Sequence, residues 1–153
     1  MSSDLLSVFD DVVRLEIELW NAVERRLRND HGLELSWFEV TRAVAGREAA
    51  TVSEITRELI ITVGGASKLV DRIEAAGYLA RRPNPADGRS SLIHVTDAGQ
   101  RMLRRAESTV VDELQSILGT VLPAKEWRQF ADSLSAIRTA LPHHVDTESD
   151  RTA

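Results

Sequence analysis

The sequence contains no cysteine and has few aromatic residues. Among 153 residues there are three Trp, three Phe and one Tyr. The absence of cysteine excludes disulfide bonds, thiolate metal sites and cysteine-based redox sensing. Because aromatic residues are scarce, the core must be built mainly from aliphatic side chains, and a chain of this length is expected to form one domain around such a core.

Long apolar runs and motifs for catalysis are also missing. No apolar stretch approaches the ~18 residues of a membrane-spanning helix, and no signal-peptide pattern opens the chain, so we expect a cytoplasmic protein without a membrane partner. The sequence has no Walker loop, dinucleotide-binding fingerprint, zinc-peptidase helix or nucleophile elbow. His94 has no acid or nucleophile at motif spacing, and His143 and His144 lie in a polar tail. We therefore expect no enzyme activity, no cofactor and no metal.

Charge is distributed unevenly along the chain. The net charge is −5, which by itself argues against a nucleic-acid partner. Residues 57–105, however, contain nine basic and five acidic side chains, a net charge of +4, and the rest of the chain carries −9. Because electrostatic fields are screened within ~8 Å in physiological salt, the local excess of positive charge matters more to a polyanion than the total.

Hydrophobic periodicity and turn residues predict six helices and two short strands. The helices are expected at 4–29, 36–47, 51–59, 63–76, 97–119 and from Pro123 onward, and the strands at 78–82 and 90–95. Ser36 and Thr51 each stand three residues before a Glu, which is the capping-box pattern. Ile60 and Ile61 are expected to form a buried turn, after which Thr62 caps the next helix.

This order of elements predicts a mainly α fold, a winged helix-turn-helix domain flanked by long terminal helices. Two short helices joined by a tight turn and followed by a two-stranded hairpin are typical of that domain. We assign residues 1–33 to an N-terminal dimerisation helix, 34–97 to the winged domain, 98–141 to C-terminal dimerisation helices and 142–153 to a flexible tail.

The terminal helices carry more apolar surface than one small winged domain can cover. In the last helix the apolar residues step by three and four, a heptad-like stripe typical of a helix seam. A second copy of the chain, in a symmetric homodimer, is the simplest partner for these faces. The residues that we expect at the dimer interface are Leu5, Phe9, Val12, Leu114, Ile117, Trp127, Phe130, Leu134, Ile137 and Leu141.

Several short motifs resemble the MarR family of bacterial transcriptional regulators. They are Thr51–Ile55, Lys68–Glu74, Gly77–Leu79, Asn84–Arg89 and Val95–Gly99. The family's wing usually reads Asp-Pro-x-Asp-Arg-Arg, so Asn84 and Gly88 depart from the pattern whereas Asp87 and Arg89 keep it. The resemblance implies a homodimer on a pseudo-palindromic operator, with helix 63–76 in the major groove and the wing in the neighbouring minor groove. It also implies release of DNA by a small aromatic or anionic effector.

Within the wing, Pro83 and Pro85 are expected to stiffen the loop and Gly88 to let its tip turn, so that Arg89 is held out toward DNA. Asp87 is expected to orient a guanidinium by a bidentate pair. The residues that we expect to contact DNA are Thr51, Ser53, Arg57, Val63, Gly64, Gly65, Ser67, Lys68, Arg72, Arg82, Asp87 and Arg89.

Some of these residues have alternative interpretations. Gly64 and Gly65 either let backbone N–H groups approach phosphate or relieve crowding against Ile60 and Ile61. Thr51 also fits a purely capping role. Because Arg81 and Arg82 alternate across a strand, at most one of them faces DNA.

A ligand pocket is harder to read from the sequence. Trp20, Trp37, Phe38 and Arg42 offer stacking rings and a cation for an aromatic acid, but aromatic residues at such positions also fit a core role. Overall we expect a dimeric DNA-binding regulator, a repressor. The alternatives are a winged-helix module that binds proteins rather than DNA, and a constitutive DNA binder without an effector.

Overall fold

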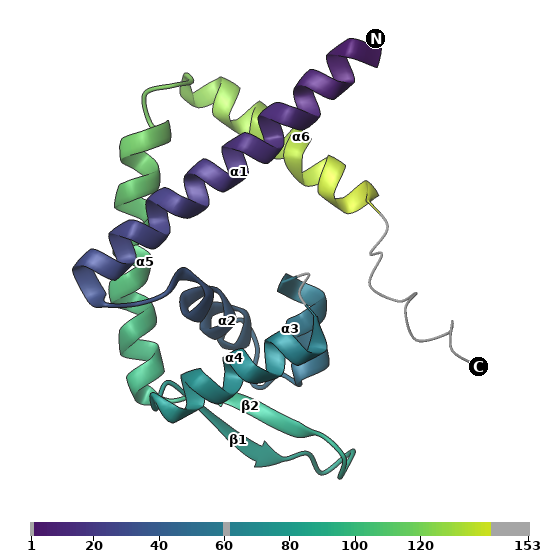
Figure 1. The fold of residues 1–153 in the computed structure, drawn as a ribbon, viewed down its shortest axis with the longest axis vertical. Helices are drawn as coiled ribbons and strands as arrows, with labels where there is room; N and C mark the ends of the chain where they lie inside the picture. Colours follow the sequence, from purple (N-terminus) through teal and green to yellow (C-terminus); the bar gives the residue numbers. More distant parts are fainter. Residues whose placement is uncertain (1, 60–61, 142–153) are drawn as a thin grey trace.

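The computed structural model describes residues 2–59 and 62–141. Within them six helices and two strands follow one another in the expected order (Figure 1): α1 (Ser2–His31), α2 (Leu35–Ala45), α3 (Val52–Leu59), α4 (Val63–Ala75), β1 (Leu79–Pro83), β2 (Ser91–Val95), α5 (Asp97–Leu118) and α6 (Ala124–Ala140). The architecture is mainly α with a small antiparallel wing, as predicted. The expected turn at Ile60 and Ile61 and the expected tail at 142–153 lie outside the described residues.

Two aliphatic clusters form the core. The first joins α2, α3, α4 and the sheet through Val40, Val44, Ala50, Ile55, Val70, Ile73, Leu79 and Ile93. The second joins the C-terminal half of α1 to α2 and α5 through Val23, Leu27, Leu33, Leu35, Phe38, Leu103 and Ala106. Because α2 contributes to both clusters, it connects the winged domain to the long helices.

The start of α2 differs from the prediction. The helix begins at Leu35, its N-cap is Glu34, and Ser36 forms no capping box. Instead the Leu35 N–H donates to a carboxylate oxygen of Glu24 on α1. Because Leu33 and Leu35 are buried in the second cluster, α2 begins one residue before Ser36, and Ser36 lies inside the first turn. Pro123 is likewise the N-cap of α6 rather than a residue of its first turn.

The wing is an antiparallel pair in which Leu79 lies opposite Val95 and Pro83 opposite Ser91. Ala50, just before α3, adds an isolated bridge to Ile93 that the sequence did not predict. The Ala50 N–H donates to the Ile93 carbonyl at 3.0 Å, and the Ile93 N–H donates to the Ala50 carbonyl at 2.7 Å. A single bridging residue has no periodicity to detect. The bridge ties the start of α3 to the base of the wing.

The start of α5 packs closely against the turn that precedes β1. The Thr96 hydroxyl donates to the Gly77 carbonyl at 2.6 Å and accepts the Gly99 N–H at 3.0 Å, which caps the helix. A Cβ atom at Gly99 would lie 2.2 Å from the backbone oxygen of Tyr78 and 2.7 Å from Val95. Only glycine therefore lets α5 approach this turn.

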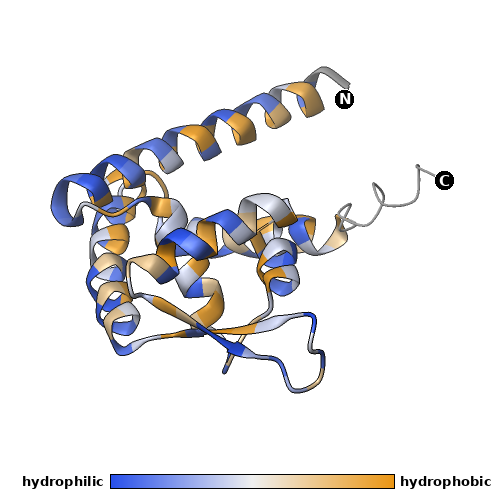
Figure 2. Ribbon diagram, turned by 60° about the horizontal axis from the view of Figure 1, so that its bottom comes forward, coloured by the Kyte–Doolittle hydropathy of each residue, from blue (hydrophilic) through white to orange (hydrophobic). Residues whose placement is uncertain are grey.

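Both terminal helices leave apolar side chains in solvent. Leu5 is 67% exposed, Phe9 63% and Ile137 61%, and α6 has no buried residue. In Figure 2, α1 projects away from the body with apolar residues recurring along its length. None of the described helices is long and apolar enough to span a membrane. These faces have no cover within residues 2–59 and 62–141.

We predict that Gly99→Ala destabilises the protein by about 1–3 kcal/mol, because the added methyl group must displace backbone that has no room to move. Gly88→Ala is the matched control, since a Cβ at Gly88 meets nothing within 4 Å. Equilibrium denaturation at a fixed protein concentration measures both variants. Equal stability of the two would contradict the close approach.

Candidate nucleic-acid interface

The buried side of α4 determines which of its residues face outward. Ala66, Val70 and Ile73 are fully buried, and Leu69 is partly buried against the first core cluster. Gly64 and Lys68 lie on the opposite side and are exposed. In Figure 1, α4 lies next to α3 in the lower half of the molecule, with the two strands of the wing below it.

The tip of the wing is held by side-chain-to-backbone hydrogen bonds rather than by glycine. Asn84 Oδ1 accepts the Ala86 N–H at 3.0 Å, and Asn84 Nδ2 donates to Ser90 Oγ at 2.9 Å. Asp87 Oδ1 accepts the backbone N–H of Arg89 at 3.0 Å. The bonds accepted by Asn84 Oδ1 and Asp87 Oδ1 form Asx turns, in which a short polar side chain hydrogen-bonds to the backbone N–H two residues further along the chain.

Two expectations about the wing are therefore wrong. Asp87 binds the backbone of Arg89 and not a guanidinium, so it shapes the loop. Gly88 does not adopt a positive φ, which among the described glycines occurs at Gly32 and Gly77. The turn comes from Asn84 and Asp87, whose local hydrogen bonds need no left-handed residue.

Thr51 and Glu54 form the predicted capping box at the start of α3. Thr51 N–H and Oγ1 donate to Glu54 Oε2 at 2.7 and 2.9 Å, and the Glu54 N–H donates to Thr51 Oγ1 at 3.3 Å. Since its hydroxyl is used in the box, Thr51 acts as a cap in this structure, and its expected phosphate contact is not supported.

The same hydrogen bonds hold the pKa of Glu54 below its ordinary value, the bond from the Thr51 backbone most of all. A carboxyl whose folded pKa is lowered stabilises the fold above its unfolded pKa of ~4.3. That contribution is lost as the pH falls through the lowered folded value.

The basic residues of this surface fall into two groups. The first is already paired with acids of the same chain. Arg72 donates to Glu34 at 2.6 Å. Arg81 lies 2.6 Å from Asp71 and 2.8 Å from Glu74, on the side of β1 that faces α4. The Arg81 guanidinium is therefore bound by acids of α4, and Arg82 is the arginine of this strand that faces outward.

The second group has no carboxylate within 4.0 Å in the described part of the chain. It consists of Arg57 on α3, Lys68 on α4, and Arg82 and Arg89 on the wing, all of them exposed. Ser53 is also exposed on α3, Val63 is 59% exposed at the start of α4, and Ser67 is half-buried. These four free cations come from α3, α4 and the wing, three elements that pack together through the first core cluster.

The two glycines of α4 differ in their surroundings. A Cβ at Gly64 would meet no described atom within 4 Å, whereas at Gly65 it would lie 3.0 Å from the Thr62 hydroxyl. That hydroxyl accepts the Gly65 N–H at 3.2 Å and caps the helix. Gly65 thus has a structural reason within the described residues, whereas Gly64 leaves backbone open on the outer surface.

The four residues expected to bind a ligand lie in different surroundings. Phe38 is 2% exposed in the second core cluster, and Trp20 is 42% exposed on α1. Trp37 packs edge-on against Tyr78 with ring centroids 6.3 Å apart. Arg42 lies over the Phe38 ring and pairs with Glu39 at 2.6 Å. Two of the aromatic rings thus serve mainly as core.

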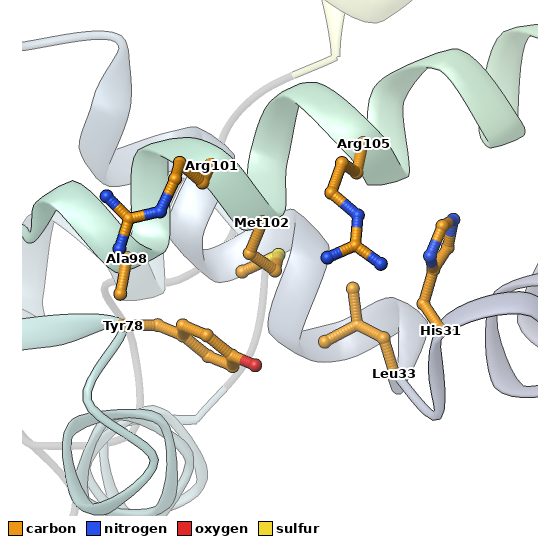
Figure 3. A pocket seen from close by; sticks show the side chains of 7 residues that line it. All are labelled: His31, Leu33, Tyr78, Ala98, Arg101, Met102 and Arg105. Atoms are coloured by element: carbon orange, nitrogen blue, oxygen red, sulfur yellow. The ribbon is translucent and has the colours of Figure 1, made fainter.

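A pocket of about 230 Å³ lies elsewhere, between the end of α1 and the first half of α5. It is lined by His31, Leu33, Tyr78, Ala98, Arg101, Met102 and Arg105. Figure 3 shows the two guanidinium groups along one wall, with the Tyr78 ring and Leu33 opposite. Neither arginine has an ion-pair partner among the described residues. The i, i+4 spacing of Arg101 and Arg105 was the only signal in the sequence.

No set of three His, Asp or Glu side chains within residues 2–59 and 62–141 is placed to hold a metal ion.

Comparisons with known proteins agree with this geometry. The sequence model of the MarR family matches residues 31–90. The chain is 26% identical over 129 residues to the multiple antibiotic resistance protein MarR of Escherichia coli K12, covering 82% of this chain and 89% of that protein.

Solved structures share the fold. Sco3205, a MarR family transcriptional regulator from Streptomyces coelicolor solved in complex with DNA, has a TM-score of 0.81 at 20% identity and covers 92% of this chain and 89% of that one. CouR from Rhodococcus jostii RHA1, solved bound to p-coumaroyl-CoA, has a TM-score of 0.74 at 22% identity and covers 86% of this chain and 91% of that one. In helix order, in the wing and in the sequence of residues 31–90, this chain is similar to the MarR family of winged helix-turn-helix transcriptional regulators.

Proposed function

We propose that the protein is a homodimeric repressor that binds a pseudo-palindromic DNA operator through α4 and the wing. The observation that carries this proposal is that Arg57, Lys68, Arg82 and Arg89 are exposed on α3, α4 and the wing without an ion-pair partner among the described residues, in a chain whose net charge is −5. Free cations on a helix and on an adjacent hairpin suit phosphates on either side of a groove. The shared fold of Sco3205, which was solved in complex with DNA, supports a DNA partner.

The exposed apolar faces of α1 and α6 support a dimer. Phe130, Leu134, Ile137 and Leu141 are 40–61% exposed on one stripe of α6. Apolar patches of this extent mark interaction surfaces. Binding to two half-sites requires a two-fold axis that sets the two copies of α4 about one DNA turn apart, ~34 Å.

The pocket beside α5 supports an organic anion as the effector. Arg101 and Arg105 supply charge, and Met102, Leu33 and the Tyr78 ring supply an apolar wall. The pocket therefore replaces the site that the sequence suggested around Trp20 and Phe38. Occupation would press on the junction between the dimerisation helices and the winged domain and favour another spacing of the two α4 helices.

We predict that Arg89→Ala lowers affinity for the operator by about tenfold or more, because it removes the free cation at the tip of the wing. The operator is first selected from a random-sequence duplex library, and affinity is then measured by fluorescence anisotropy over a range of salt concentrations. Arg138→Ala on α6 is the control with the same change of charge. A wild-type protein that enriches no duplex would favour the protein-interaction alternative.

We predict that Leu134→Glu combined with Ile137→Glu converts the dimer to monomers, because each carboxylate would be buried unpaired in the seam. Light scattering gives the mass of each species. Ser135→Glu, on the opposite side of α6, should leave the mass unchanged. If the double variant stays dimeric, the seam lies elsewhere.

We predict that 4-hydroxybenzoate raises the melting temperature of the protein and that 4-hydroxybenzamide, its neutral counterpart, does not. Arg105→Ala should abolish the shift. Equal shifts with the acid and the amide would exclude a role for the two arginines, and no shift with a panel of such acids would favour the constitutive binder.

A further inference from the structure

Helix α4 carries two cations, Lys68 and Arg72. Arg72 is already paired with an acid from outside this helix, Glu34 at the N-cap of α2. Its Nη2 donates to Glu34 Oε1 at 2.6 Å, and its guanidinium carbon lies 5.5 Å from the centroid of the Trp37 ring. The arginine side chain is nevertheless 55% exposed, and that of Glu34 is 29% exposed. The guanidinium is therefore drawn toward α2 while it remains in contact with solvent.

The orientation of α4 does not depend on this ion pair. Val70 and Ile73 of α4 are fully buried against Val40 and Val44 of α2 in the first core cluster. Burial of four aliphatic side chains contributes several kcal/mol, whereas an exposed ion pair contributes at most about 1 kcal/mol. Loss of the pair would leave the helix in place and would free the charge of Arg72.

We propose that Glu34 competes with a DNA phosphate for Arg72 and thereby lowers the affinity of the protein for DNA. This inference rests on the proposed function, because it requires α4 to lie against DNA. In the free protein Arg72 is bound to Glu34. On DNA the guanidinium exchanges the carboxylate for a phosphate oxygen.

The exchange is energetically accessible in both directions. A half-exposed ion pair is weak because water and salt screen it. A contact with phosphate adds counterion release, which the pair with Glu34 does not supply. Glu34 therefore reduces the contribution of Arg72 to DNA affinity, and it does not pair with any of the four free cations.

The test is the affinity of Glu34→Gln for two duplexes, the selected operator and a 30-bp duplex of mixed sequence, measured by fluorescence anisotropy. We expect tighter binding to both by about two- to fivefold, the range that corresponds to the loss of one exposed ion pair. Glu39→Gln is the matched control, because it removes the same charge from the same helix and Glu39 pairs with Arg42, not with α4.

Arg72→Gln supplies the second arm of the experiment. It should weaken binding and reduce the slope of log affinity against log salt by about one. In the double variant, Glu34→Gln should no longer have an effect, because its benefit acts through Arg72. Thermal unfolding of each variant verifies that the fold is retained.

The outcomes separate this inference from the function on which it rests. Binding by the wild-type protein with unchanged or weaker binding by Glu34→Gln would overturn the inference alone; weaker binding would mean that the pair positions α4. A salt slope unaffected by Arg72→Gln would overturn it too. If the wild-type protein binds neither duplex, the proposed function and this inference both fail.

Discussion

One face of α4 is buried in an aliphatic cluster, and the rest of the surface that we assign to DNA depends on that contact. Val70 and Ile73 lie against α2, and the same cluster includes Ile93 of the wing and Ile55 of α3. A single packing arrangement therefore sets the outward side of α4 and the place of the wing beside it. Because aliphatic side chains are held by close packing rather than by charge, this arrangement does not depend on the charges of the outer residues.

Internal acids regulate how much positive charge the protein shows to a polyanion. Arg72 pairs with Glu34 at the N-cap of α2 and Arg81 pairs with acids on α4, whereas the charged groups of Lys68 and Arg89 have no carboxylate within 4.0 Å among the described residues. A chain with a negative net charge can thus carry a surface with a small excess of unpaired positive charge. Such a surface binds DNA while remaining sensitive to salt and to small changes in geometry, which suits a regulator that must dissociate.

The junction between α5 and the winged domain is where the long helices meet the DNA-binding elements. Gly99 brings the start of α5 against the turn before β1, and the pocket lined by Arg101 and Arg105 lies just beyond it. Close packing there leaves little freedom for independent motion. A ligand that alters this junction would move α4 relative to the dimer helices as a unit.

The sequence by itself determined the order of elements, the capping box of α3 and the resemblance to the MarR family, because periodicity, capping and short motifs are local properties that adjacent residues encode. Tertiary structure alone decided that Asp87 shapes the wing, that Ser36 caps nothing and that Phe38 belongs to the core. It also decided that Arg72 is bound by Glu34, 38 residues away. Ion pairs and pockets join residues that are distant in the chain, and only the packed core brings those residues within reach of each other.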